Sequence, residues 1–467
     1  MSPDSTPPLP VDPNSSGPTW FGGYQRPVLL TGIGLVGAVV VRFADLLGTS
    51  VCALFGIVLA LALAFAFSEN PRRIRWRTVL GGMALQVGLA LAVLWFQVGD
   101  LKPGRILFEK IADLVKKLLA FSDEGARFVF GPLADPASMG RVFERKYAFV
   151  FAFQALPVLI FVSALSAVLY HLGVLQVVVR VLGAGMRRFM RTSGSETLCA
   201  VANVFLGQTE APLVVKPYIA GMSRSELLAL MAGGMATMSG ALLAVYIDQG
   251  ADAVALMTTS LMAAPCGLYL SKIVIPELAP NQKGTSVAVE IPGQPTQKPH
   301  RNVLEAVSAG TSEGMSLALN IAAMMVSFLA LLAMLDALMA WLTGGVTLAS
   351  ILGEVFRPVA ILCGFQTQDA SLAGELLGKK LVANEFVAFS ELNGEEKFQA
   401  LTPNGRILAC FALSGFANLA SIGIQIGGIG AMAPVRRGDL SSLGTKALLV
   451  GFLTTLVNAA LAAILWR

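Results

Sequence analysis

The sequence predicts an all-α polytopic membrane protein with eight or nine transmembrane helices and two re-entrant helical hairpins in an inverted repeat. Three observations support this fold class. Hydrophobic residues make up 55% of the chain and charged residues 13%, against about 25% charged residues in soluble domains. Apolar windows long enough to cross a bilayer recur along the chain. Two further apolar segments carry a polar centre, which is costly in an ordinary membrane span.

The apolar windows define the membrane spans. A helix that crosses the hydrocarbon layer needs about 20 mostly apolar residues. Eight uncharged windows of this order occur, at 46–68, 78–99, 147–179, 227–247, 253–271, 314–335, 407–435 and 447–466. A weaker window at 27–41 is cut short by Arg42 and Asp45, and we expect it to form an additional helix.

Two amphipathic segments lie between the spans. Residues 105–121 place apolar side chains at helical spacing, with charged side chains on the opposite face; the apolar set is Ile106, Leu107, Ile111, Leu114, Val115 and Leu118. This pattern is typical of a helix that lies in the membrane interface. Residues 175–191 repeat it more weakly.

The distribution of Lys and Arg predicts which loops are cytoplasmic. Five loops together hold 17 Lys and Arg against 6 Asp and Glu; they are 69–77, 180–197, 216–226, 272–301 and 436–446. The apolar segment 196–222 begins and ends on this same side, so it must enter the membrane and turn back, with Gln208, Thr209 and Glu210 at its tip. The same count places 336–406 outside, so 370–395 enters from the opposite face with Asn384 and Glu385 at its centre. The loop 100–146 fits less well, with 9 Lys and Arg and 7 Asp and Glu on the predicted outer side.

Each hairpin is followed by a span that glycines and hydroxyl residues interrupt, at 233–240 and at 415–423. The unit of hairpin and broken helix therefore occurs twice, in opposite orientations. Such matching breaks in two inverted halves are the best sequence indication of a substrate site near the midplane of a secondary transporter. Non-helical backbone at that depth persists where it lines a cavity or is buried in protein.

The polar residues of these breaks suggest what the site binds. Gln208, Thr209 and Glu210 offer the mixed donors and acceptors that could read the edge of a heterocyclic base. Glu385 can accept hydrogen bonds from two adjacent hydroxyls, and Asn418 and Ser421 share one helical face. The structural alternatives are a packing salt bridge for each glutamate and helix-to-helix hydrogen bonds for Asn418 and Ser421.

Several functional classes find no support in the sequence. The net charge of +5 is too small and too dispersed for nucleic-acid binding. Two histidines and five isolated cysteines make neither a metal cluster nor a disulfide framework. An intramembrane enzyme with Glu210 or Glu385 as general base lacks a nucleophile motif or a His/Asp pair, so we predict no enzymatic activity. A scaffold that transports nothing would leave the polar hairpin tips unexplained.

The run 203–218, with 382–389 and 415–423, closely resembles the concentrative nucleoside transporter family. Residues 156–165 and 434–439 support the resemblance, which extends from about residue 50 to the C-terminus. It implies a multi-pass protein of the cell membrane, a homotrimer whose scaffold holds a mobile transport domain that moves like an elevator. For individual residues, the resemblance implies that Gln208, Thr209 and Glu210 contact the nucleobase and that Phe416 lies against the nucleobase. Glu385, Asn418 and Ser421 would hold the ribose.

The resemblance also implies a coupling cation. The positions that match the family's sodium site are Asn203, the Leu206 carbonyl, Thr237 and the Met238 carbonyl, with threonine here in place of the commoner serine. Oxygen ligands of this kind suit a hard alkali cation. We therefore predict sodium-coupled nucleoside symport, with a proton-coupled transporter, or one of another small polar solute, as the alternative.

The predicted spans, the loop charges, the composition and the resemblance together give the domain organisation. We divide the chain into a disordered tail (1–26), an extra N-terminal helix (27–45), N-terminal spans that belong mainly to the scaffold (46–179), a first transport-domain repeat (180–275), a cytoplasmic linker (276–301), a scaffold span with a connecting helix (302–369), a second transport-domain repeat (370–435) and a C-terminal span (436–467). In the two repeats the hairpins are 196–222 and 370–395, and the broken helices are 227–247 and 407–435.

Overall fold

The protein is built from helices. The computed structural model describes residues 25–97, 101–135, 138–139, 141, 150–154, 156–277 and 300–466, and every regular element within these ranges is helical. The predicted all-α fold is therefore confirmed. Most of the predicted tail, 1–26, and of the predicted linker, 276–301, lies outside the described residues.

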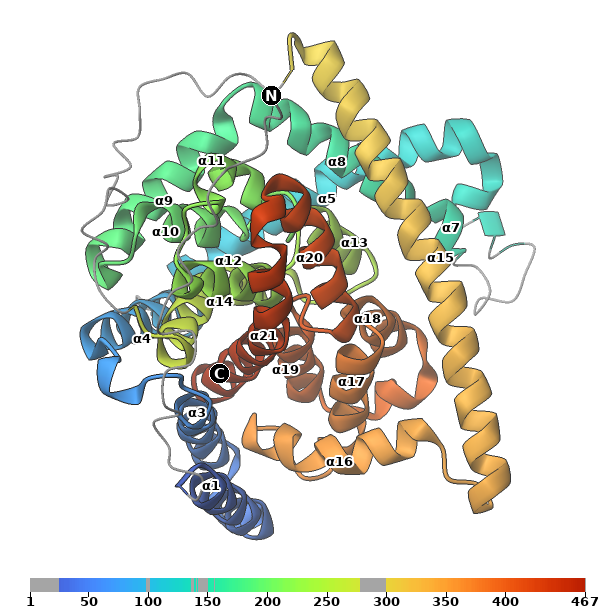
Figure 1. Ribbon diagram of the computed structural model, residues 1–467. Helices are drawn as coiled ribbons and strands as arrows, with labels where there is room; N and C mark the ends of the chain where they lie inside the picture. The colour runs from blue at the N-terminus through green and yellow to red at the C-terminus, as the bar shows by residue number, and fades with distance from the viewer. Residues whose placement is uncertain are drawn as a thin grey trace, which may run out of the picture.

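The N-terminal part supplies long apolar helices and one amphipathic helix (Figure 1). Its elements are α1 (Gln25–Arg42), α2 (Ala44–Leu47), α3 (Thr49–Ala66), α4 (Trp76–Ala90, continued by a π-helical turn Leu91–Trp95), α5 (Pro103–Phe130), α7 (Phe151–Gln154) and α8 (Leu156–His171). Helix α1 is the additional helix that the window at 27–41 predicts. Helix α5 contains the predicted amphipathic segment and continues beyond it at both ends.

One predicted span is wrong in its extent. The window 147–179 is not a single helix, because α8 ends at His171 and α9 (Val174–Met190) begins after Gly173. Gly173 has φ 82°, a left-handed conformation that glycine adopts without steric cost and that ends α8. Lack of charge made the window look continuous, whereas the amphipathic pattern of 175–191 correctly indicated a separate helix.

The two predicted repeats have matching helical breaks. In the first, α10 (Gly194–Ala202) and a turn lead to the 3-10 segment Ala211–Val215 and α11 (Lys216–Ile219), followed by α12 (Arg224–Ala236), α13 (Gly240–Asp248) and α14 (Ala253–Val274). In the second, α17 (Ala370–Val382) and α18 (Glu385–Gly394) precede α19 (Pro403–Leu413) and α20 (Leu419–Met432), and α21 (Arg437–Leu465) follows as the C-terminal span. The insertion of the two hairpins from opposite membrane faces stays a prediction.

Side-chain caps explain where the second half of each broken helix starts. Ser239 accepts a hydrogen bond from Leu242 N at 3.3 Å at the start of α13. Asn418 accepts one from Ser421 N at 2.9 Å at the start of α20. Each cap satisfies a backbone N–H that the helix itself leaves unpaired, which is important where water is scarce.

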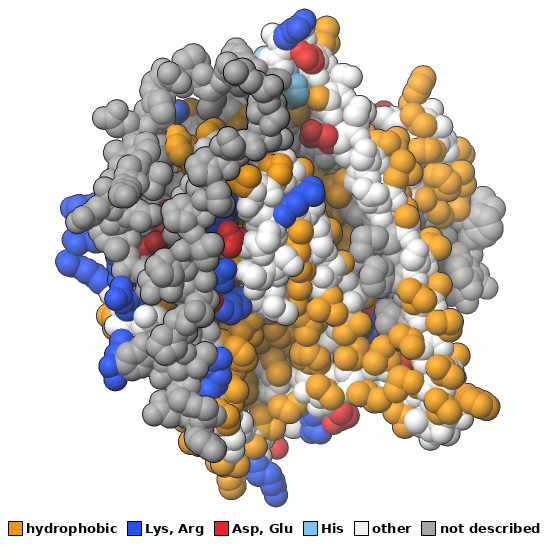
Figure 2. Space-filling view, viewed as in Figure 1, with side chains coloured by type: hydrophobic (Ala, Val, Ile, Leu, Met, Phe, Trp, Pro, Cys, Tyr) orange, Lys and Arg blue, Asp and Glu red, His pale blue; other side chains and the backbone are white. Residues whose placement is uncertain are grey.

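The repeats form the core of the bundle. Helices α12, α14 and α21 pack against one another, α3 packs on α21, and α4 packs on α14. Helix α15 (Val303–Thr343) packs along α8 at the edge of the molecule, and α16 (Leu348–Leu362) packs on α17 (Figure 1). Much of α15 faces outward with large apolar side chains, among them Leu319, Val326, Leu331, Met334 and Trp341 (Figure 2).

Six described helical stretches are long and apolar enough to cross a bilayer: Thr49–Ala66, Trp76–Trp95, Ala152–His171, Arg224–Asp248, Ala253–Val274 and Pro434–Leu465. Helix α15 contains the predicted span 314–335. The predicted span 407–435 is divided into α19 and α20, as its glycines and polar residues indicated. The protein is therefore an integral membrane protein by the length and composition of its helices.

Candidate functional site

The first hairpin contacts the broken helix of the second repeat. Gln208 Nε2, in the turn after α10, donates to Ser421 Oγ on α20 at 3.2 Å. Both side chains are buried. The contact joins residues 213 positions apart in the chain, so the predicted base-binding and sugar-binding groups lie next to each other.

The second hairpin joins the same group through Asn418. Asn418 Nδ2 donates to Glu385 Oε2 at 2.9 Å, while its Oδ1 caps α20 through Ser421 N. Glu385 is the first residue of α18, where the helix dipole favours a carboxylate. Gln208, Ser421, Asn418 and Glu385 therefore form one buried polar network that connects both hairpins with α20.

The other three predicted substrate residues lie around this network. Thr209 packs against α20, since a β-carbon at Gly428 would lie 2.9 Å from Thr209 Cγ2. Glu210 Oε2 accepts from Gly207 N at 3.2 Å within its own turn, and the described hydrogen bonds do not connect it to Glu385. Phe416 is buried in the break between α19 and α20.

The two helix breaks meet at their backbones. Phe416 N donates to the Thr237 carbonyl at 3.2 Å. The preceding residue, Gly415, has φ 98°, and a β-carbon there would lie 2.6 Å from the Ala236 carbonyl oxygen. A residue other than glycine would meet both a strained backbone and a steric clash at this position. The close approach of the two helix breaks therefore requires glycine at position 415.

The predicted cation ligands surround the end of α12. Asn203 is fully buried and follows α10, and a β-carbon at Gly233 would lie 3.1 Å from its Nδ2. Next to it, Phe205 O accepts from Gly240 N at 3.0 Å, so the Asn203–Leu206 turn lies against the break that contains Thr237 and Met238.

One atom of this turn lacks a partner. Asn203 Oδ1 is buried without a hydrogen bond, and leaving a buried acceptor unpaired costs about 1–3 kcal/mol. A cation bound there would satisfy it. Within the described ranges, no group of three or more His, Cys, Asp and Glu is placed to hold a metal ion. The polar atoms near Asn203 Oδ1 are amide, hydroxyl and carbonyl groups, the kind of oxygen ligand that hard cations use.

Two further polar residues, which are not among the predicted site residues, belong to this region. Gln425 is fully buried and its Nε2 donates to both Gln208 Oε1 at 3.1 Å and the Met231 carbonyl at 3.0 Å. Its spacing from Asn418 and Ser421 puts the three on one helical face, a signal available in the sequence. The second is Lys380, a lysine within the apolar hairpin 370–395.

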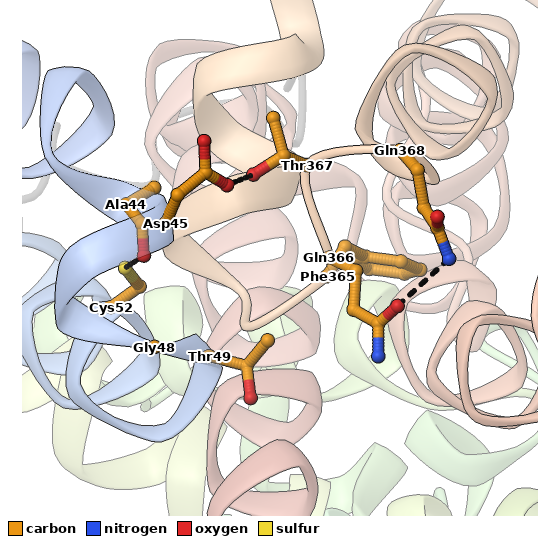
Figure 3. Close-up of a pocket in the computed structure, with 9 residues that line it drawn as sticks. All are labelled: Ala44, Asp45, Gly48, Thr49, Cys52, Phe365, Gln366, Thr367 and Gln368. Carbon is orange, nitrogen blue, oxygen red and sulfur yellow. Dashed lines mark hydrogen bonds between the residues drawn. The ribbon is translucent and has the colours of Figure 1, made fainter.

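A pocket of about 390 Å³ lies elsewhere, between the start of α3 and the loop after α16 (Figure 3). Thr367 Oγ1 donates to Asp45 Oδ1 at 2.5 Å across it. The pocket is lined by Ala44, Asp45, Gly48, Thr49, Cys52, Phe365, Gln366, Thr367 and Gln368. None of the predicted site residues is among these, so this pocket is separate from the polar network.

Comparison with known families covers most of the chain. Residues 55–133 match the Na+ dependent nucleoside transporter N-terminus, and residues 255–463 match the corresponding C-terminus. Residues 152–253 match a nucleoside recognition domain named Gate. The three matches together include every residue of the polar network and of the predicted cation site.

Individual relatives are similar over nearly the same extent. An uncharacterized transporter of Haemophilus influenzae is 40% identical over 420 residues, covering 88% of this chain and 96% of the relative. The Bacillus subtilis transporter YutK is 41% identical over 88% of this chain and 98% of its own. Sodium/nucleoside cotransporter 1 of Mus musculus is 39% identical over 88% of this chain, which spans 63% of that longer protein.

The fold is also similar to solved structures. CNTnw in an inward-facing substrate-bound state is 37% identical, with a TM-score of 0.81 over 89% of this chain and 98% of that one. A variant of CNTnw in an outward-facing state gives a TM-score of 0.82 over the same 89%. Since this family is one of transporters, the prediction of no enzymatic activity is confirmed. The chain, an all-helical integral membrane protein with matching broken repeats, belongs to the concentrative nucleoside transporter family.

Proposed function

We propose that the protein takes up nucleosides together with sodium. The observation that carries this proposal is the buried network from Gln208 through Ser421 and Asn418 to Glu385, which connects the two hairpins. A ligand that replaced these internal hydrogen bonds would be held by both repeats at once. The relatives named sodium/nucleoside cotransporters support a nucleoside as that ligand.

The chemistry of the network fits the two halves of a nucleoside. Gln208 provides an amide donor and acceptor, and Thr209 and Glu210 follow it in the same turn, a set suited to a nucleobase edge. Glu385 has a carboxylate that can accept from two neighbouring ribose hydroxyls, and charge-assisted hydrogen bonds of this kind are the stronger ones. Gln425 acts as a positioning residue, because it orients the Gln208 amide.

Sodium would bind between the first hairpin and the break after α12. Asn203 Oδ1, the Leu206 and Met238 carbonyls and Thr237 would hold it, and the unpaired Asn203 oxygen supports this placement. Bound sodium would fix the turn that carries Gln208 and raise the affinity for nucleoside. Such coupling is typically about 1–3 kcal/mol and must be reciprocal, so nucleoside would tighten sodium binding equally.

We further propose an elevator-type cycle within a homotrimer, in the cell membrane. The scaffold would include α15, whose outward apolar side chains are suited to lipid or to neighbouring subunits. The repeats 180–275 and 370–435 would carry the substrate. CNTnw has been solved in inward-facing and outward-facing states, and we propose that this chain alternates between corresponding states.

Uptake of labelled uridine into proteoliposomes tests this function. Sodium outside is replaced by choline at constant pH, and in a separate arm a pH gradient is imposed without sodium. We expect uptake to depend on sodium. Undiminished uptake in choline would refute sodium coupling, and uptake driven by the pH gradient alone would identify protons instead. Mass spectrometry of the contents should recover unaltered uridine.

A further inference from the structure

Lys380 is a charged side chain in the interior of the second repeat. It lies near the end of α17 and is fully buried. Its Nζ donates to the Ala412 carbonyl at 2.9 Å, to the Ser414 carbonyl at 3.0 Å and to Thr455 Oγ1 at 3.0 Å. An ammonium group has three N–H donors, so every donor of Lys380 has an acceptor.

Burial of this ammonium group requires a reason. Moving a charge out of water costs several kcal/mol even after relaxation, and an apolar residue of similar size would pack there without that cost. Among the lysines that the structure describes, Lys272 shares this burial. Lys272 differs because it pairs with a carboxylate, its Nζ lying 2.5 Å from Glu196 Oε2. Lys380 instead donates to two carbonyls and a hydroxyl, which are the acceptors that an alkali cation also uses.

The two carbonyls belong to the end of a helix. Helix α19 ends at Leu413, and Ala412 and Ser414 lie on either side of that end. The last carbonyls of a helix lack internal partners and carry the negative end of its dipole. Lys380 therefore neutralises the C-terminus of the first half of this broken helix.

The end of α12 in the first repeat has the same construction. Thr237 follows α12 and its hydroxyl donates to the carbonyl four residues earlier, Gly233 O, at 2.9 Å. Ser414 follows α19 and its hydroxyl donates to Cys410 O, also four residues earlier, at 2.6 Å. Thr237 and Ser414 are thus equivalent positions in the two repeats.

The difference between the repeats is what faces each helix end. The end of α19 faces the Lys380 ammonium from hairpin 370–395. The end of α12 meets the backbone of Gly415 and Phe416, and beside it hairpin 196–222 presents the Asn203 side chain with its unpaired Oδ1. A positive group is built into one site, and at the other one buried oxygen, Asn203 Oδ1, is left without a partner.

We propose that Lys380 is a tethered cation, which occupies in the second repeat the place that the coupling ion takes in the first. The second helix break then has its positive charge permanently, whereas the first has one only while an ion is bound. This inference rests on the proposed function for the identity of the ion in the first repeat. The role of Lys380 as a cation at the second break is supported by its own hydrogen bonds and does not require the proposed function.

Chemical rescue of Lys380→Ala tests the proposal. This substitution removes three carbons and the ammonium group, which n-propylammonium replaces atom for atom. The thermal unfolding of the purified variant is measured in detergent without sodium or nucleoside, so that the result does not depend on the proposed transport function. We expect a lowered unfolding midpoint that rises again, saturably, with n-propylammonium. Neither 1-propanol nor tetramethylammonium should have this effect, because the first lacks the charge and the second lacks N–H donors.

Nucleoside binding gives a second readout. Labelled uridine binding to Lys380→Met in sodium should weaken roughly 10- to 100-fold, within the usual range of coupling between sites. Thr455→Val removes one of the three acceptors and should have a smaller effect in the same direction. Lys397→Ala, an exposed lysine of the same repeat that pairs with Glu375, is the matched control and should bind uridine as the wild type does.

Two outcomes would overturn the proposal. One is a Lys380→Ala protein that n-propylammonium does not stabilise beyond its effect on the wild type. The other is a Lys380→Met protein that binds uridine with unchanged affinity. If Lys380→Ala does not fold, Thr455→Val still tests the proposal. An unfolding midpoint and a uridine affinity equal to those of the wild type would contradict it. Failure of sodium coupling in the wild type would refute the proposed function and leave the rescue result standing.

Discussion

Gln208 of the first hairpin donates a hydrogen bond to Ser421 of the second broken helix at 3.2 Å. This contact links the two repeats, because Ser421 is hydrogen-bonded to Asn418, which in turn is hydrogen-bonded to Glu385 of the second hairpin. A polar contact so deep in an apolar bundle is stabilising only while both partners are present, since an unpaired buried group is costly. The predictions below separate the groups that bind substrate from those that hold this arrangement.

Glu385→Gln should weaken ribonucleoside binding and leave dideoxynucleoside binding nearly unchanged. Glutamine keeps an acceptor for Asn418 but loses the charge that holds two ribose hydroxyls, and hydrogen bonds to charged groups contribute about 1.5–3 kcal/mol. We expect the uridine affinity to fall by the corresponding factor of about 10 to 150. The affinity for each nucleoside is measured by how strongly unlabelled uridine or 2′,3′-dideoxyuridine inhibits the uptake of labelled uridine. Glu391→Gln, on the same helix but paired with Lys379, is the control; equal losses for both nucleosides would contradict the ribose role.

Asn203→Ala should raise the sodium concentration needed for half-maximal uptake. The substitution removes the unpaired buried oxygen that we assign to the ion. Loss of one uncharged ligand should cost about 1 kcal/mol, or roughly fivefold in sodium affinity. Sodium titrations of uridine uptake give this value. Cys199→Ala, one turn earlier on α10 and in contact with the Asn203 amide, keeps the oxygen and should retain the wild-type sodium dependence.

Gln425→Met should weaken the binding of purine and pyrimidine nucleosides alike. Methionine fills a similar volume but releases the Gln208 amide and removes the hydrogen bond from Gln425 to the Met231 carbonyl. We expect an affinity loss of about 1–2 kcal/mol, since an oriented amide is lost rather than a charge. Binding of labelled uridine and adenosine is compared with that of Ile426→Met, the neighbouring residue on α20. A loss confined to one nucleoside would instead make Gln425 a specificity determinant.

Gly415→Ala should destabilise the folded protein. The substitution places a side chain at φ 98° and 2.6 Å from the Ala236 carbonyl oxygen. Backbone strain alone costs about 1–3 kcal/mol, and the clash adds to it. The unfolding midpoint in detergent should fall. Gly423→Ala, where an added β-carbon would meet nothing within 4 Å, should have little effect; similar behaviour of the two variants would refute the close crossing.

Lys272→Met should destabilise the base of the first repeat. Lys272 Nζ lies 2.5 Å from Glu196 Oε2 and bonds Ser225 Oγ at 2.9 Å, which connects α14, α10 and α12. Breaking a buried ion pair by removing one partner costs about 3–5 kcal/mol, because the other charge stays buried. Adding Glu196→Gln should recover much of this loss. Urea unfolding of the single and double variants measures the free energy of unfolding. A double variant no more stable than Lys272→Met would contradict a stabilising ion pair between Lys272 and Glu196.

The sequence determined the class of protein and the location of its helix breaks. Composition and apolar windows were sufficient for an all-helical membrane protein, because a bilayer imposes length and hydrophobicity on every span. The interruptions at 233–240 and 415–423 are visible because glycines, hydroxyl residues and Asn418 are incompatible with a uniform apolar helix. Motif resemblance identified the family, which the comparisons confirmed. The prediction of one span over 147–179 is wrong, since apolar content does not reveal a turn at a glycine.

Tertiary structure decided which of these polar residues meet. Gln208 and Ser421 are 213 residues apart, and no local pattern predicts their contact. In the sequence, Lys380 does not differ from its neighbour Lys379, and Gln425 is one more polar residue on the face of Asn418 and Ser421. Their significance lies in acceptors that other helices supply: the Gln208 amide and the Met231 carbonyl for one, and the broken end of α19 for the other. Hydrogen bonds in a buried network depend on atoms brought within about 3 Å, and folding alone fixes that distance.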